Sequence, residues 1–371
     1  MKSNTRYFKV SMETLRKLAK DSKNFSLVAG FLVMARHSSG VEIEGHPPYT
    51  FTGAGANSIK TKVGGMADAR SNNILQELIA RKLLAPASLA PKYSRMARYR
   101  VMQGSLDLEL PHALVDGLGN ADIPLHRIRA CTAPADAYRE TLKALSANDC
   151  QLDALMLMLE MYASLRMSQC GGVDPRVIHR GWEESNVRAK EGNFQWLSNP
   201  LQASSYTSEV HRILAHAIEG KKVPDNISHR FWSAWTRLQA AGLFYEAVMM
   251  FDANPASNET AAAVCTLRVN DFHSGAQRDN EPKDPSLLAN LDTTLAFYTQ
   301  ELNDREDPEQ IRFTWPLDHG YVIGVWRPRY RAATRDGGIW IEEENRRCLT
   351  LAEQIVSRRE CIPATDEDLP F

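Results

Sequence analysis

The sequence of 371 residues is poor in cysteine and has no long apolar run. Its six cysteines are scattered and never form a CxxC pair, which argues against a zinc ribbon or a disulfide scaffold and is typical of a reducing cytoplasm. No apolar stretch approaches the ~18 residues that a membrane-spanning helix needs. The first residues, MKSNTRYFKVSMETLRK, lack the apolar core of a secretion signal. We therefore expect a cytoplasmic protein without a membrane partner.

Signatures of the common catalytic sites are also missing. The sequence has no GxxxxGKS or GxxxxGKT phosphate loop, and Gly53-Ala-Gly55 lacks the third glycine of a dinucleotide site. Its ten histidines form no HExxH or HxH pair, and there is no GxSxG elbow. The acidic run Asp304-Arg-Glu-Asp307 indicates a solvated surface. We expect no enzyme, cofactor or metal, with a nuclease built from scattered carboxylates as the alternative.

What the sequence does have is a sharp division of charge. The whole chain carries a net charge of −1, but residues 1–105 hold 17 Lys and Arg against 6 Asp and Glu, a net of +11. The remaining residues hold 27 basic against 39 acidic side chains, a net of −12. A basic segment of this kind favours binding to nucleic acid, and the alternative is an unevenly charged surface without a polyanionic partner.

The basic segment has the pattern of a winged helix. Apolar residues predict a buried helix over 25–36, and a short strand follows near 49–51. A second helix over 56–63 ends at Gly64-Gly65, and a third covers 68–83 with an apolar stripe of Ile74, Leu75, Leu78 and Ile79. Residues 84–87 and 97–101 are expected to pair as a hairpin with its tip, the wing, at 88–96. Helix, glycine turn, helix and hairpin is the order of a winged helix-turn-helix.

In such a module the third helix would enter the major groove of DNA. Its polar residues off the apolar stripe are candidates for contacts with base edges: Arg70, Asn72, Asn73 and Gln76. Basic side chains on the second helix and on the wing are candidates for phosphate contacts: Lys60, Lys62, Lys92, Arg95 and Arg98. Many winged helices instead bind protein or dimerise, so a protein partner or a homodimer stays an alternative.

The rest of the chain repeats this pattern weakly. A helix over 227–241 followed by strands over 243–251 and 264–269 resembles the helix and hairpin of the first module. A helix over 285–302, strands near 311–315, 321–326 and 338–342, and a helix over 343–359 are expected after it. Aromatic residues lie beside arginines around Trp326, Arg327, Arg329, Tyr330 and Arg331. They would either stack unpaired bases or, as we prefer, form a sheet core with an Arg-rich edge.

The predicted fold class is α+β and mainly helical, with tandem winged-helix modules, β-hairpin wings, a small C-terminal α+β region and a disordered acidic tail. The expected segments are a basic winged-helix domain at 1–105, a connector at 106–150 and a second winged-helix-like domain at 151–280. The α+β region at 281–360 and the tail at 361–371 follow.

The acidic tail consists of Asp366, Glu367, Asp368, Leu369, Pro370 and Phe371. A partner pocket would bury the Phe371 ring while a basic residue at its rim pairs the α-carboxylate. The acidic residues would steer the tail to a basic surface, and Pro370 would lower the entropy lost on docking. The alternative is an ordinary polar chain end.

These six residues resemble the acidic tip of bacterial single-stranded-DNA-binding proteins, which typically reads DDDIPF. Here Glu replaces Asp, Leu replaces Ile, and neither an OB-fold nor a long linker precedes the tip. The resemblance implies recruitment of host replication and repair proteins, and the tandem layout is similar to that of iteron-plasmid initiators. We therefore expect a DNA-binding replication or recombination protein of a mobile element. A single-stranded-DNA-binding protein without an OB-fold and a winged-helix transcription regulator are the alternatives.

Overall fold

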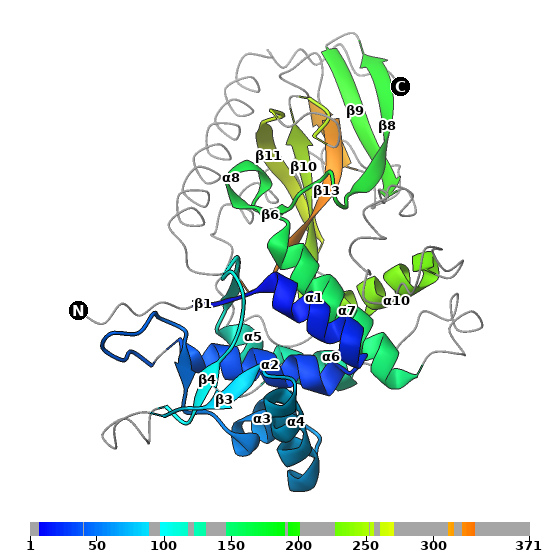
Figure 1. The fold of residues 1–371 in the computed structure, drawn as a ribbon. Coiled ribbons are helices and arrows are strands. Elements are labelled where there is room, and N and C mark those ends of the chain that lie inside the picture. The colour runs from blue at the N-terminus through cyan, green and yellow to red at the C-terminus, as the bar shows by residue number, and fades with distance from the viewer. Residues whose placement is uncertain are drawn as a thin grey trace. The chain divides into compact units, whose positions relative to one another are not determined.

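The fold is mixed α+β, and Figure 1 shows its elements. The computed structural model describes residues 7–39, 41–88, 97–117, 122–130, 146–189, 192–200, 227–251, 253–255, 260–270, 311–314 and 321–330. The helices are α1 (Met12–Ser22), α2 (Phe25–Ser38), α3 (Ala56–Val63), α4 (Asp68–Ala80), α5 (Ala113–Asp116), α6 (Pro124–Ala130), α7 (Ala147–Ala163), α8 (Met167–Cys170) and α10 (Ile227–Ala240).

The strands of the described residues form four small sheets. They are β1 (Tyr7–Val10), β2 (Phe51–Thr52), β3 (Leu84–Pro86), β4 (Tyr99–Val101), β5 (Leu108–Pro111), β6 (Leu165–Arg166), β7 (Gly172–Val173), β8 (Arg180–Ala189), β9 (Gly192–Pro200), β10 (Phe244–Phe251), β11 (Ala263–Asn270), β12 (Ile311–Thr314) and β13 (Tyr321–Pro328). The chain divides into two compact units, of which unit 1 lies within 1–165, 207–245 and 328–334. Unit 2 lies within 166–206, 246–327 and 335–371. The five segments expected from the sequence stay a prediction.

Helix α7 is the central helix of unit 1. Its residues 152–162 are all buried, because an almost unbroken apolar run leaves no side of the helix polar. It packs against α1, α2, α6, α10 and β5. Its N-terminus is fixed by a capping box, in which Ser146 accepts from the Asp149 N–H and Asp149 accepts from the Ser146 N–H. The helix therefore begins at Ala147.

Two carboxylates buried on α7 each bind an arginine of another helix. Glu160 accepts from Nε and Nη2 of Arg16 on α1, both at 2.6 Å. Asp153 accepts from Nε and Nη2 of Arg230 on α10, at 2.8 and 2.7 Å. Burying a carboxylate without a partner is costly, so these bidentate pairs fix where α1 and α10 meet α7.

A two-stranded antiparallel sheet joins β1 to β5 across about 100 residues of chain. Phe8 pairs with Leu110 and Val10 with Leu108, and these four side chains are buried. On the other face, Lys9 and Glu109 form an ion pair, with Nζ 2.8 Å from Oε1. Alternating apolar and polar residues explain the strand conformation. Each strand has only four residues, and so short a pattern did not predict their pairing from the sequence.

Unit 2 contains most of a six-stranded sheet in the order β11-β10-β13-β8-β9-β12. The pairs β10–β11, β13–β8, β8–β9 and β9–β12 are antiparallel. The expected strands at 243–251, 264–269, 311–315 and 321–326 are present as β10, β11, β12 and β13, and α10 matches the helix expected over 227–241. The strand expected at 338–342 and the helices expected over 285–302 and 343–359 lie outside the described residues.

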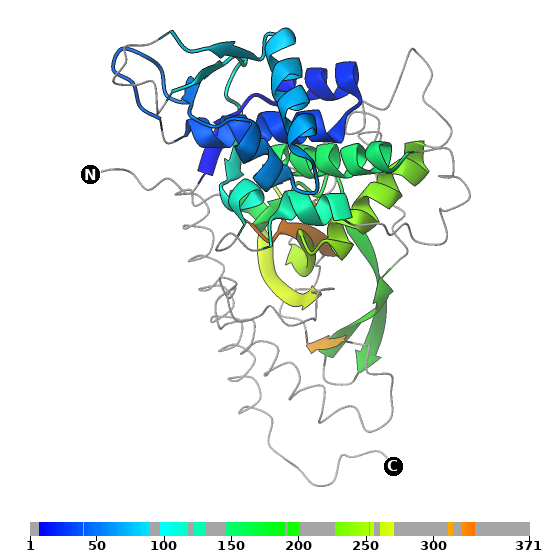
Figure 2. The same cartoon turned by 90° about the horizontal axis from the view of Figure 1, so that it is seen from below.

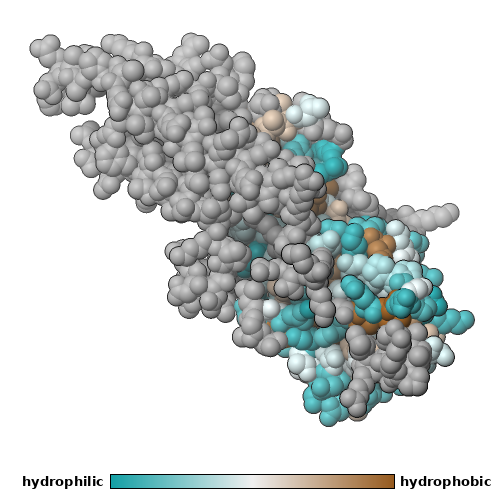
Figure 3. Space-filling view, turned by 90° about the vertical axis from the view of Figure 1, so that its left-hand side faces the viewer, coloured by the Kyte–Doolittle hydropathy of each residue, from teal (hydrophilic) through white to brown (hydrophobic). Residues whose placement is uncertain are grey.

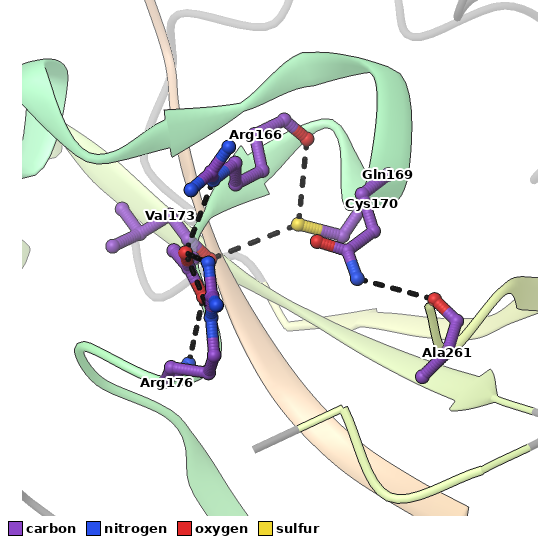
Figure 4. Close-up of polar contacts among 7 residues, drawn as sticks. Arg166, Gln169, Cys170, Val173, Arg176 and Ala261 are labelled. Atoms are coloured by element: carbon purple, nitrogen blue, oxygen red, sulfur yellow. Dashed lines mark hydrogen bonds and ion pairs between the residues drawn. The ribbon is translucent and has the colours of Figure 1, made fainter. Parts of the chain in front are cut away.

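A buried carboxylate that binds two arginines holds the start of unit 2 together (Figure 4). The Asp174 carboxylate accepts from Arg166 Nε at 3.1 Å and from Arg176 Nη2 at 2.7 Å. Burial alone would raise the pKa of Asp174, but the hydrogen bonds from Arg176 and Arg166 outweigh it and lower the pKa. Nearby, the Cys170 thiol points to the carbonyl oxygens of Arg166 and Val173, and Gln169 donates to the Ala261 carbonyl at 3.1 Å.

Three of the aromatic and arginine residues at and just after the end of β13 are buried. Trp326 is 3% and Arg327 1% exposed, and Tyr330 is also buried. Arg327 Nε donates to the Cys170 carbonyl at 3.3 Å, and its Nη2 lies 3.1 Å from Met249 Sδ. Of the two interpretations of these residues, a sheet core is therefore the one that their burial supports, since stacked bases would need exposed rings.

Candidate nucleic-acid interface

Helices α3 and α4 both pack against helix α2 (Figures 1 and 2). Residues 25–35 of α2 are buried throughout, and Asn24 caps the helix by accepting from the Leu27 N–H. Gly30 permits a close approach: a Cβ at this position would lie 2.8 Å from Ile74 Cγ2 of α4 and 3.5 Å from Ile59 Cγ2 of α3. The helices expected over 25–36 and 56–63 are confirmed as α2 and α3.

A three-stranded antiparallel sheet in the order β2-β4-β3 follows the helices. It confirms the expected hairpin of residues 84–87 with 97–101, as β3 pairs Leu84 with Val101. The expected strand near 49–51 is present as β2, shifted by a residue and hydrogen-bonded to the far side of β4. The core face carries Leu84 and Val101, whereas Arg100 of β4 and Arg98, the residue before the strand, are exposed.

Helix α4 presents a polar face opposite its buried stripe. Of the expected stripe, Ile74, Leu75 and Leu78 are buried and Ile79 is half-buried, and the helix ends at Ala80, three residues before the expected end. The amide side chains of Asn72, Asn73 and Gln76 are exposed, and among the described residues they form no hydrogen bond with one another or with a neighbour. Their spacing places them on one side of the helix. This face therefore presents three amide groups to solvent or to a partner.

Arg70 also lies on the exposed side, one turn before these amides. Its guanidinium makes one long hydrogen bond of 3.4 Å to Ser26 Oγ at the start of α2. Arg98, just before β4, is exposed, and its Nη1 lies 3.8 Å from where a Cβ of Gly55 would stand, at the start of α3. Arg100 is exposed as well; the alternation in Arg98-Tyr-Arg100 was the signal for it, and we did not single it out from the sequence. Lys92 and Arg95 lie outside the described residues.

The two lysines of α3 are engaged within the protein. Lys60 Nζ is 2.9 Å from Asp68 Oδ1, and both side chains are largely exposed, so a phosphate can compete for this lysine. Lys62 is different, because its side chain is 14% exposed and lies 3.4 Å from Asp116 Oδ1. Asp116 also accepts from Arg36 Nε at 2.8 Å. Lys62 therefore ties α3 to α5 and is a poorer candidate for a phosphate contact than Lys60.

Residues 51–101 combine these features with a net positive charge. They hold nine Lys and Arg against two Asp and Glu, a net of +7, and the two acidic residues are paired with Lys60 and Arg81. On the face of the molecule in Figure 3 the described surface is mostly hydrophilic, with small apolar patches. Met102, 40% exposed, is the one large exposed apolar side chain among the described residues. The surface thus favours an anionic, polar partner over an apolar one.

The turn between α3 and α4 is held from outside the module by α6. Arg129 donates through Nη1 to the Gly64 carbonyl and through Nη2 to the Gly65 carbonyl, the latter at 2.9 Å. His126 Nε2 lies 2.9 Å from the Thr61 carbonyl oxygen. Burial lowers the pKa of Arg129, and the nearby positive charge of Arg70 lowers it further. Neither His126 nor Arg129 was a sequence candidate, since both lie in the segment expected to be a connector.

Comparison with other proteins adds no assignment. No protein-family model, curated protein or solved structure matches this chain. In the described parts of the chain, no helix is both long enough and apolar enough to cross a membrane. The same residues contain no group of three or more His, Cys, Asp and Glu side chains placed to hold a metal ion. Residues 366–371 lie outside the described residues.

Proposed function

We propose that residues 25–101 form a winged helix that binds double-stranded DNA, with α4 as the recognition helix. The observation that carries this proposal is the exposed amide face of α4, beside Arg70 and in a segment with a net charge of +7. Asn and Gln pair bidentately with the N6 and N7 atoms of adenine in the major groove, and Arg with guanine. Arg98, Arg100 and Lys60 would contact phosphates beside the groove.

A second winged helix in the chain is part of the same proposal. Helix α10 followed by the β10–β11 hairpin repeats the order of α4 followed by β3 and β4. The two hairpins differ in their surroundings, because β10 is flanked by β13 in a six-stranded sheet, whereas β4 is flanked by β2 in a sheet of three. The similarity supports a duplicated helix-hairpin unit, and the larger sheet distinguishes the second copy.

The proposal places this chain in DNA replication or recombination, as a protein of a mobile element. The sequence of Asp366–Phe371 supports that role, since it resembles a tip that recruits host replication and repair proteins. In a pull-down from bacterial extract, we expect the full chain to retain such proteins and the chain without Phe371 to lose them. Equal retention by both chains would remove the recruitment role and leave the DNA-binding one.

The DNA-binding function is tested by titrating labelled double-stranded and single-stranded DNA with the full chain over a series of salt concentrations. We expect tighter binding to the duplex and an affinity that falls steeply with salt. Replacing Arg98 and Arg100 by Ala should lower the salt slope by about one for each phosphate that is no longer neutralised. The control is Arg81→Ala, because Arg81 is already paired with Glu77.

Four outcomes would contradict the proposal in different ways. Absence of binding to either DNA would refute it, and so would a salt slope that both arginine substitutions leave unchanged. Preference for single strands would favour a single-stranded-DNA-binding protein without an OB-fold. Sequence-specific duplex binding combined with an inert Asp366–Phe371 tail would favour a transcription regulator.

A further inference from the structure

Helix α6 is anchored to the core of unit 1 on one side and to the α3–α4 turn on the other. Leu125 and Ile128 are fully buried, and Gln151 Nε2 of α7 donates to the Arg129 carbonyl at 2.8 Å. On the opposite side, His126 and Arg129 are three residues apart and so lie on one face of the helix. This face meets the turn through the carbonyl groups of Thr61, Gly64 and Gly65.

Two of the three carbonyl groups, those of Thr61 and Gly64, are ones that a helix end leaves without partners. Thr61 lies in the last turn of α3, Gly64 is its C-cap residue, and Gly65 follows. A guanidinium presents its donors as a fork, so Arg129 serves two adjacent carbonyls at once, which a lysine cannot do in the same geometry. A cationic side chain is also favourable at the C-terminal end of a helix.

Gly64 shows how closely α6 is fitted to the turn. Its φ of +75° is a conformation that residues with a Cβ rarely adopt, and a Cβ there would lie 2.6 Å from the His126 ring. The turn between α3 and α4 therefore packs against α6 so closely that no side-chain atom fits at position 64. Because Gly30 lets α4 approach α2 closely, α4 is held from two directions, by α2 and by the turn.

We infer that α6 sets the orientation of the recognition helix α4, and that His126 and Arg129 are positioning residues for DNA binding. This inference rests on the proposed function. A recognition helix that is already fixed loses less entropy on binding than one that must be ordered by the DNA. His126 and Arg129 act through the turn and need not touch DNA themselves.

The test compares the full chain with Arg129→Ala, His126→Ala and His126→Gln in the same salt series. We expect the two alanine variants to bind duplex DNA about tenfold more weakly at every salt concentration, with an unchanged salt slope. Glutamine retains an N–H donor for the Thr61 carbonyl, so His126→Gln should recover most of the affinity. If Arg129→Ala does not fold, the comparison of His126→Ala with His126→Gln still tests the inference.

Arg127 provides the matched control on the same helix. It faces away from the turn, donates to the Ala241 carbonyl at 2.7 Å and to the Tyr330 hydroxyl, and pairs with Asp122 at 3.0 Å. Arg127→Ala should destabilise the fold yet bind DNA like the unsubstituted chain at temperatures well below its unfolding transition. If it weakens DNA binding as much as Arg129→Ala, the effect is one of general stability and the inference is wrong.

A second measurement needs no DNA. Amide hydrogen exchange of residues 62–68 in the free protein should become faster in Arg129→Ala, while exchange within α7 is unchanged. Unchanged exchange at the turn would refute the positioning role by itself. A salt slope lowered by about one would instead make Arg129 a phosphate contact and overturn the inference. If the unsubstituted chain binds no DNA, the proposed function fails, and the inference about binding fails with it.

Discussion

The Asp153 carboxylate on α7 and the Arg230 guanidinium on α10 face each other in a bidentate pair, 2% and 13% exposed, with N···O distances of 2.7 and 2.8 Å. The two residues are 77 positions apart in the chain. Burial alone would lower the pKa of Arg230, but the hydrogen bonds to Asp153 and its charge outweigh burial and raise the pKa. The pair fixes α10, which follows a long stretch of chain, on the central helix of unit 1.

Replacing Asp153 by Asn should destabilise the protein by about 3–5 kcal/mol, because the Arg230 charge would stay buried without a counter-charge. Urea unfolding measures this change. As a control, Glu77→Gln on the exposed Arg81 pair should change the free energy of unfolding by less than about 1 kcal/mol. The double variant Asp153→Asn with Arg230→Met should be more stable than Asp153→Asn alone. If it is equally unstable, the cost comes from lost packing and the ionic explanation is wrong.

The stability of the protein should fall as the pH is lowered below about 6.5, the ordinary pKa of histidine. Burial lowers the pKa of both His37 and His112, and the positive charge of Arg36 lowers both further, against the opposing charge of Asp116. Above pH 6.5 both histidines are neutral whether the chain is folded or not. Below it the unfolded chain takes up protons that the folded protein resists, so the free energy of unfolding decreases.

Unfolding midpoints at pH 7.5, 6.5 and 5.5 check this expectation. The double variant His37→Gln and His112→Gln should lose less stability than the unsubstituted chain between pH 7.5 and 5.5. Some dependence should remain, since burial also lowers the pKa of His179 in unit 2. A pH dependence identical in the two proteins would show that other groups are responsible.

Gly30→Ala should destabilise the protein, although alanine favours a helix over glycine by about 1 kcal/mol. The added Cβ would stand 2.8 Å from Ile74 Cγ2, so α4 would have to move away from α2 at a cost of about 1–3 kcal/mol. Thermal or urea unfolding gives the sign directly. Combining Gly30→Ala with Ile74→Ala should cost less than the sum of the two single changes. Additive costs would mean that the two residues do not meet.

The parts of the fold that were predictable are those fixed by local pattern. The glycine pair after Val63 predicted the bounds of α3, and the stripe of Ile74, Leu75 and Leu78 predicted α4 except for its end, which lies three residues earlier than expected. The hairpin of β3 with β4 followed from its apolar ends. These signals need no knowledge of what lies elsewhere in the chain.

The parts that were missed depend on interactions between distant residues. Strands β1 and β5 are four residues each, and their alternation becomes informative only once they are paired. The hydrogen bonds from Arg129 to the turn carbonyls cross about 65 residues and carry no sequence signature. Among the site candidates, Lys60 pairs with the exposed Asp68, whereas Lys62 is largely buried beside Asp116, a residue of another helix. The polar, exposed face of α4 was thus predicted from the sequence, whereas the contact of α6 with the turn before α4 was not.

The amide face of α4 should determine which DNA sequence is bound. We expect Asn73→Ala and Gln76→Ala to reduce the preference for the best duplex over a random one, each by about 1–3 kcal/mol, because each change removes a bidentate contact with a base. The salt slope should not change, since an amide carries no charge. Selection of bound duplexes from a random pool, followed by titration, measures both quantities. Asn57→Ala, an exposed amide at the start of α3, is the control. If Asn73→Ala and Gln76→Ala weaken all duplexes equally, α4 does not read the bases and the recognition role belongs elsewhere in the chain.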